Sequence, residues 1–331
     1  MPPVCLVRAP AGLGRDNDMR RHLLHASLVA ATVSTVLILG ACSSGAPAGD
    51  SAPPAGSSSS GEKIPVVAST NVYGNIAEVV GGDAVQVTSI ISDPEQDPHS
   101  YEANTQVALQ LSKAKLVIEN GGGYDDFVDT MLKSSKNTPT VLNAVTISGF
   151  KAPTGGELNE HIWYSFPSVQ KIASQIATEL GKTDPGQAST FTANAATFNT
   201  QVGKLISSEA QLKSKYSGEG VGLTEPVPLY LLEAIGLDNK TPEEFSEAIE
   251  EGDDVSAAVL KETLDLYANK EVKALVYNEQ TSGPVTEQVK AAADKAGIAV
   301  VPVTETLPQG KTYLTWMQGN VDSVGQALAK Q

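Results

Sequence analysis

The stretch IPVVASTNVYGNIAEVVGGDAVQVTSII, residues 64–91, decides the fold. A run rich in β-branched residues at 64–70 is followed by helix-like spacing near 72–80 and by a second such run at 85–91. Two apolar strands separated by an amphipathic helix are typical of a parallel βαβ unit. The stretch therefore predicts an α/β fold in which helices cover a parallel sheet.

The same alternation continues along the chain. Further strands are expected at 115–120 and 140–145, with helices near 104–112 and 124–133. After Gly220 a second series predicts strands at 221–224, 273–279 and 298–304, and helices at 228–237, 257–268, 285–296 and 313–330. The expected fold class is α/β, with two lobes that each contain a mainly parallel sheet flanked by helices.

A single long helix is expected to join the two lobes. Roughly 185–215 has no strand signal and is rich in Ala, Gln, Thr and Lys, which favours a helix with many exposed positions. A helix of that length would restrain hinge motion. The predicted division is an N-terminal lobe at 62–180, a rigid linker helix at 181–217 and a C-terminal lobe at 218–331.

The N-terminus has the pattern of a lipoprotein signal. Arginines precede an apolar run at 26–39 that is too short to span a bilayer comfortably, and Leu-Gly-Ala-Cys, ending at Cys42, matches the bacterial lipobox. Residues 1–41 are therefore predicted to be a signal peptide, within which 1–18 are interpreted as a misassigned start. Cys42 is the predicted lipidation site, and 42–61 form a Ser, Gly, Ala and Pro tether. This predicts an extracytoplasmic protein anchored to the outer face of the cell membrane.

Composition and charge narrow the class of partner. The chain has 331 residues, 41% of them hydrophobic, and its formal net charge is −15 with a pI near 4.7. Because nucleic-acid binding needs a basic face, a nucleic-acid partner is not expected. Neither a P-loop nor a GxGxxG after a strand occurs in the sequence, so a nucleotide site is not expected either. The net negative charge makes a cation a more natural ligand than a nucleic acid or a nucleotide.

Histidine is scarce, which makes its positions informative. Of the four in the chain, His22 and His25 fall in the predicted signal peptide, and His99 and His161 remain in the mature protein. His99 follows the strand that ends at residue 91, and His161 follows a long loop and precedes a helix that starts with proline. Both therefore lie in loops, where an imidazole can reach a cleft.

Two glutamates follow strands in the second lobe. Glu225 and Glu305 come after the strands at 221–224 and 298–304, and ligands of open α/β sheets bind beyond the carboxyl ends of strands. Two imidazoles with two carboxylates suit a borderline divalent ion such as Zn²⁺, Mn²⁺ or Fe²⁺. A metal site between the lobes is thus predicted, formed by His99, His161, Glu225 and Glu305.

Several stretches together resemble a known family. They are DPEQDPHSYE, NEHIW, LTEP followed by LYLLEAIGL, VYNEQTS and VTETLPQGKTYLTWMQGNVDSV. From about Val66 to the C-terminus the chain resembles the substrate-binding proteins of ABC transporters that import zinc or manganese, called cluster A-I or the zinc/manganese adhesin family. The resemblance implies two α/β lobes joined by a rigid helix, a metal ion between them, no enzymatic activity, and an ABC permease as partner. A metallochaperone is a further candidate partner.

The resemblance also bears on individual residues. His99 and His161 fall on the family's first two ligand positions and Glu225 on the third, which varies between histidine and glutamate. Glu305 falls where the family usually has aspartate, and Glu279 on a recurring glutamate near the site. The stretch from Gly149 to Glu160 carries no histidine, unlike the His-rich loop of many zinc proteins. The ligand set resembles the manganese or iron type, yet the same donors hold Zn²⁺ more tightly than Mn²⁺ in vitro, so zinc stays a candidate.

Other readings of these residues remain open. Asn71 and Tyr73 are expected to line the cleft or to hydrogen-bond a ligating histidine, and Trp163 and Trp316 are interpreted as core. The acidic run at 243–254 is interpreted as a solvated face. Alternative functions are a surface adhesin, a protein that binds chelated iron, and a zinc hydrolase, although no HExxH motif occurs.

Overall fold

The computed structural model describes residues 62–93, 98–99 and 101–330. Residues Ser59–Gln331 form one compact unit. The predicted signal peptide, Cys42 and the tether up to residue 61 lie outside the described residues. Within the described part of the chain, no helix is both long enough and apolar enough to cross a membrane.

The first sheet is parallel and four-stranded among the described residues, in the order β2-β1-β3-β4. Its strands are β1 (Ile64–Thr70), β2 (Val85–Ile91), β3 (Leu116–Glu119) and β4 (Thr140–Asn143). The helices of this lobe are α1 (Asn71–Gly81), α2 (Thr105–Leu111), α3 (Phe127–Ser134) and α4 (Ala144–Ser148), with a 3₁₀ turn, η1, at Gly82–Ala84. Six of the seven residues of β1 are buried, as expected for a central parallel strand covered on both faces.

The second sheet has the same plan, with the order β6-β5-β7-β8 and parallel pairing throughout its described strands. Its strands are β5 (Gly220–Leu223), β6 (Asp238–Asn239), β7 (Ala274–Asn278) and β8 (Ala299–Val303). The surrounding helices are α7 (Leu229–Ile235), α8 (Glu243–Glu250), α9 (Ala257–Ala268), α10 (Pro284–Ala296) and α11 (Tyr313–Ala329). The predicted α/β class with two parallel sheets is confirmed.

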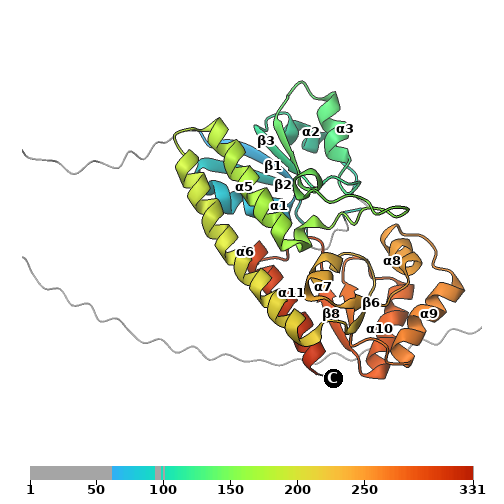
Figure 1. The fold of residues 1–331 in the computed structure, drawn as a ribbon. Helices are drawn as coiled ribbons and strands as arrows, with labels where there is room; N and C mark the ends of the chain where they lie inside the picture. The colour runs from blue at the N-terminus through green and yellow to red at the C-terminus, as the bar shows by residue number, and fades with distance from the viewer. Residues whose placement is uncertain (1–61, 94–97, 100, 331) are drawn as a thin grey trace, which may run out of the picture. The chain divides into compact units, whose positions relative to one another are not determined.

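Two long helices connect these parts. A 3₁₀ turn, η2 (Ile162–Tyr164), leads into α5 (Phe166–Thr183), and α6 (Ala188–Tyr216) follows. Helix α6 packs against α5 and α1 of the first lobe and against α7 and α11 of the second (Figure 1). One hydrophobic core cluster includes residues of both sheets together with α5, α6 and α11. Because α6 packs against helices of both lobes, it restrains movement of one lobe relative to the other.

Some element boundaries differ from the sequence prediction for local reasons. Residues 181–183 end α5 rather than begin the linker helix, because Pro185 lacks an N–H and disfavours helical backbone at Asp184. The strand predicted at 140–145 ends at Asn143, whose side chain caps α4 by accepting from the backbone N–H of Thr146 (2.9 Å). Helices α4 and α8 and the two-residue strand β6 were not predicted.

The interpretation of the two tryptophans as core is confirmed. Trp163 is 0% and Trp316 5% exposed, and both belong to the large hydrophobic cluster. Trp163 nevertheless contacts the imidazole of His161 edge-on, with ring centroids 5.1 Å apart. One side of this core residue therefore faces the predicted site.

Candidate metal centre

The structure brings both mature histidines onto one carboxylate. Glu305 follows β8, and its Oε2 lies 3.5 Å from His99 Nε2 and 3.7 Å from His161 Nε2. Donor atoms of these three residues all lie within 4.8 Å of one another. The side chains of His161 and Glu305 are 0% and 1% exposed, while that of His99 is 21% exposed. Three of the four predicted ligands thus meet at one point, with His99 on its solvent side.

Glu225, the fourth predicted ligand, is buried beside this cluster. The amide of Asn278, at the end of β7, donates to Glu225 Oε2 and to Glu305 Oε1, the latter at 2.9 Å. Glu225 Oε1 is buried and has no hydrogen-bond partner among the described residues. Glu279, predicted to lie near the site, is exposed, and it is the preceding residue that reaches the two carboxylates. Asn278 was not singled out from the sequence.

A further carboxylate, Glu250, was missed altogether. It lies at the end of α8, and its Oε1 is 3.5 Å from His161 Nε2 and 3.9 Å from His99 Nε2. The interpretation of the acidic run at 243–254 as a solvated face is therefore wrong for Glu250, whose side chain is only 9% exposed. Only the structure separates Glu250 from its acidic neighbours, because Ser246 is buried and a residue four positions later lies on the same face of the helix.

Asn159 fixes the orientation of His161. Its Oδ1 lies 2.8 Å from His161 Nδ1 and accepts from the backbone N–H of His161 at 3.0 Å. Its Nδ2 donates to the carbonyl of Pro226 in the second lobe (3.0 Å), which assigns the amide orientation. Because an amide oxygen only accepts, Nδ1 carries a proton, and Nε2 is the nitrogen that points at the carboxylates.

Aromatic rings surround the two imidazoles. Tyr124 packs edge-on against His99, with centroids 5.2 Å apart, and its hydroxyl donates to Glu305 Oε2 at 3.2 Å. The tyrosine follows three glycines at 121–123 with φ between 75° and 105°, a backbone that glycine adopts without steric cost. Together with Trp163, Tyr124 keeps bulk water from the inner side of the site, which strengthens electrostatic interactions there.

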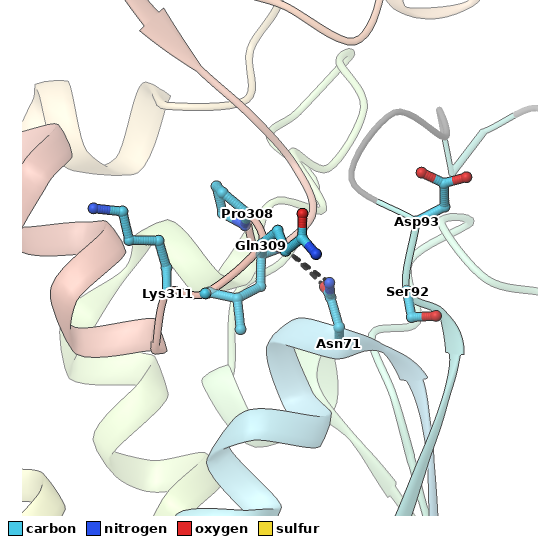
Figure 2. Close-up of a pocket in the computed structure, with 8 residues that line it drawn as sticks. Asn71, Ser92, Asp93, Pro308, Gln309 and Lys311 are labelled. Atoms are coloured by element: carbon cyan, nitrogen blue, oxygen red, sulfur yellow. Dashed lines mark hydrogen bonds between the residues drawn. The ribbon is translucent and has the colours of Figure 1, made fainter. Parts of the chain in front are cut away.

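Asn71 links the lobes rather than facing the imidazoles. Its Nδ2 donates to the carbonyl of Leu307 (2.9 Å), and its Oδ1 accepts from the N–H of the same residue (2.8 Å). Figure 2 shows this contact beside a pocket of about 610 Å³ lined by Ser92, Asp93 and Lys311 among others. Tyr73, also expected near the cleft, is 0% exposed and donates to Asn120 Oδ1. Asn71 therefore connects the start of α1 to the loop after β8, and Tyr73 is part of the hydrophobic core.

The imidazoles and carboxylates of the site are close enough to shift the pKa values of one another. Burial alone would lower the pKa of His99, but the hydrogen bond and charge of Glu305, with the charges of Glu250 and Glu160, raise that pKa to about 9. The pKa of His161 is also raised, since burial is outweighed by Glu305, Glu250 and Glu160. Burial opposes ionisation of Glu305, yet the two imidazoles hold its pKa below the ordinary value. Without a metal ion, the raised pKa of His99 keeps a positive charge beside Glu305.

The other two carboxyls behave in the opposite way. Burial raises the pKa of Glu250 to about 8, partly offset by the charges of His161 and His99. Burial likewise raises the pKa of Glu225 to about 7, against the hydrogen bond from Asn278. For both groups the positive charge of the imidazoles is too weak to offset the effect of burial. A divalent cation at the centre would supply a stronger positive charge.

The donor set and spacing suit one borderline divalent ion. Four donors at about 2.1 Å from a tetrahedral ion lie about 3.4 Å apart, a distance set by metal–ligand bond length. The four distances from the Nε2 atoms of His99 and His161 to the carboxylate oxygens of Glu305 and Glu250 run from 3.5 to 3.9 Å. Imidazole nitrogens together with carboxylate oxygens favour binding of Zn²⁺, Mn²⁺ or Fe²⁺. Ca²⁺ is disfavoured, because it prefers a site made of oxygen atoms only.

Comparison with solved structures gives the same architecture. FpvC from Pseudomonas aeruginosa, solved in complex with Mn²⁺, superposes with a TM-score of 0.68 and 23% identity, covering 81% of this chain and 99% of that one. The periplasmic zinc-binding protein TroA from Treponema pallidum gives 0.70 and 17% identity, with coverage of 81% and 99%. At these identities the likeness shows the fold.

Sequence comparison identifies the family. The manganese-binding lipoprotein MntA of Halalkalibacterium halodurans is 25% identical over 289 residues, covering 86% of this chain and 94% of that protein. The manganese ABC transporter substrate-binding lipoprotein PsaA of Streptococcus pneumoniae is 22% identical over 324 residues, covering 89% and 96%. The family model for the periplasmic component A of zinc-uptake complexes matches residues 66–327. Because this match extends over most of the chain, the protein belongs to the family of periplasmic zinc-uptake complex component A proteins.

Proposed function

We propose that this protein captures a divalent transition-metal ion, Zn²⁺ or Mn²⁺, between its two lobes and delivers it to an ABC permease. The observation that carries the proposal is the convergence of His99 and His161 on Glu305, all within 4.8 Å and largely buried. Such a cluster is costly to bury unless a cation balances its carboxylates. The family is one of metal-uptake components, not of enzymes, which argues against the zinc hydrolase alternative.

Residues 1–61 are assigned in this proposal to export and anchoring. Cys42 is the residue that would carry the lipid and hold the protein at the outer face of the membrane. The lipobox pattern and the lipoprotein names of the relatives support this assignment. The chain's acidic character fits a lipid anchor better than electrostatic attachment to anionic lipids.

Calorimetric titration tests the capture of metal directly. The unit Ser59–Gln331 is stripped with chelator and titrated separately with Mn²⁺ and Zn²⁺. We expect a tight 1:1 isotherm for the wild type and a loss of saturable binding in His99→Ala, because the imidazole lies beside both Glu305 and Glu250. The absence of saturable binding of either ion to the wild type would overturn the proposed function.

Asn159→Ala provides a test of how His161 is oriented. The substitution removes the acceptor for Nδ1–H and the contact with Pro226, so the imidazole can rotate away from the carboxylates. We expect metal affinity to fall about 10- to 100-fold, the usual effect of losing a group that orients a ligand. Asn194→Ala is the control, since it also removes an amide hydrogen bond, to Val80, but on the helix α6. Equal affinities of the two variants would refute the orienting role.

A further inference from the structure

Helix α8 places a carboxylate on the solvent side of the proposed metal centre. Glu243, Glu244 and Glu247 of this helix are exposed, whereas Phe245 and Ser246 are buried and fix its inner face. Glu250, four residues after Ser246, is thereby turned inward. Its side chain is 9% exposed, in contrast to the other acidic side chains of the helix.

The carboxylate of Glu250 points at the imidazoles, and no hydrogen-bond donor of the described residues pairs with its Oε1. Its Oε1 is buried and has no hydrogen-bond partner within the described residues, and the same is true of His161 Nε2, 3.5 Å away. A buried carboxylate oxygen left without a partner is costly and usually has a functional cause. Two unsatisfied atoms facing each other across that distance leave room for an ion that both could bind.

The position of Glu250 relative to Glu305 fits a shared ion. Each carboxylate contacts both imidazoles, at 3.5 and 3.9 Å for Glu250 and at 3.7 and 3.5 Å for Glu305. The two carboxylates thus make equivalent contacts with the same pair of nitrogens. Glu160, His99 and Glu250 form a second group of donors within 4.8 Å, and all three are only partly buried. Glu250 therefore adjoins both the buried donors and the exposed edge of the site.

We propose that Glu250 is a direct ligand of the captured metal ion, supplied by α8 to close the solvent side of the site. This inference rests on the proposed metal capture and adds a ligand from an element that the sequence pattern did not implicate. Binding through Glu250 attaches α8 to the ion, together with the two loops that carry His99 and His161. Release of the ion would then require α8 to move away from the imidazoles.

The test compares Glu250→Gln with Glu247→Gln, which removes one charge from the same helix at an exposed position. Affinity for Mn²⁺ and Zn²⁺ is measured by calorimetry, and dissociation by stopped-flow mixing with excess chelator. For Glu250→Gln we expect an affinity loss beyond the roughly 10- to 100-fold typical of a group that only orients a ligand, with faster dissociation. Glu247→Gln should behave as the wild type.

Two further measurements separate ligation from a structural role. The visible spectrum of bound Co²⁺, which depends on the number and kind of its donors, should change in Glu250→Gln and not in Glu247→Gln. Glu250→His, which restores a donor, should recover Zn²⁺ affinity relative to Glu250→Gln. Thermal unfolding of the metal-free variants identifies any that fail to fold.

The outcomes distinguish this inference from the proposed function. If the wild type binds neither ion, the proposed function fails. If the wild type binds and Glu250→Gln has the same affinity, only the assignment of Glu250 is overturned. The assignment is also overturned if Glu250→Gln slows association and dissociation by the same factor. The affinity is then unchanged, and Glu250 would affect only how fast the ion enters and leaves the site.

Discussion

Glu305→Gln is expected to abolish the stabilisation of this protein by metal. A ligand at about 1,000 times its dissociation constant stabilises the folded state by about 4 kcal/mol. For the folded unit Ser59–Gln331, whose unfolding entropy is about 2.1 cal/mol/K per residue, that corresponds to a rise of roughly 7 °C in Tm. Glu305 Oε2 is the atom that contacts both His99 and His161, so its replacement by an amide removes the shared negative charge of the site. Melting curves with and without Zn²⁺ measure the effect.

A matched control is available in the first lobe. Glu119 is also a buried carboxyl (6% exposed), and its Oε1 accepts from Asn143 at 2.9 Å. Glu119→Gln preserves shape in the same way but should leave the metal-induced rise in Tm intact. If Glu305→Gln kept a wild-type rise, Glu305 would not be a ligand, and the contacts made by the two imidazoles would need another explanation.

Glu305→Gln should also reduce the thermal stability of the metal-free protein. In the metal-free protein Glu305 balances the positive charges of two imidazoles whose pKa values it raises. Its replacement leaves His161, which is 0% exposed, without that counterion, and the imidazole must then lose its proton to avoid an uncompensated buried charge. The metal-free variant should therefore unfold at a lower temperature than the metal-free wild type at neutral pH.

Much of the architecture could be predicted because it follows from local patterns. Strands β1 and β2 were located within a residue because apolar β-branched runs have few alternatives. His99 and His161 could be singled out because they are the two histidines left in the predicted mature chain and both lie in loops beside predicted elements. Glu225 and Glu305 followed from the rule that ligands bind beyond the carboxyl ends of parallel strands.

The remaining features of the site depend on tertiary contacts that carry no local signal. Asn159 and Asn278 are ordinary loop and strand-end residues in the sequence, and their roles arise from contacts with Pro226, Glu225 and Glu305. Glu250 is one of several acids in a charged run, and only the burial of one face of α8 separates it from its neighbours. Charge periodicity alone could not make that distinction.

Affinity for the metal ion is expected to rise steeply with pH. The pKa of His99 is raised to about 9, so this imidazole is protonated near neutral pH in the metal-free protein, and the pKa of His161 is raised in the same direction. Binding must release the His99 proton, since only a neutral imidazole coordinates a metal. Release of the His99 proton alone makes the association constant increase about 10-fold per pH unit between pH 6 and 8, and ionisation of Glu250, whose pKa is about 8, makes the dependence steeper. Titrations in buffers with different ionisation enthalpies count the protons.

The metal-free and metal-bound forms should respond to pH with opposite signs. A raised histidine pKa stabilises the metal-free fold fully below about pH 6.5, and this contribution is lost as pH rises through about 9. Glu250, with a pKa of about 8, acts in the same direction, because the fold favours its neutral form. The metal-induced rise in Tm should thus be larger at pH 8 than at pH 6. Glu209→Gln is the control, since this buried carboxyl on α6 has a pKa of about 8 but no contact with the site. A pH-independent affinity would mean that the imidazoles are already neutral before the ion arrives.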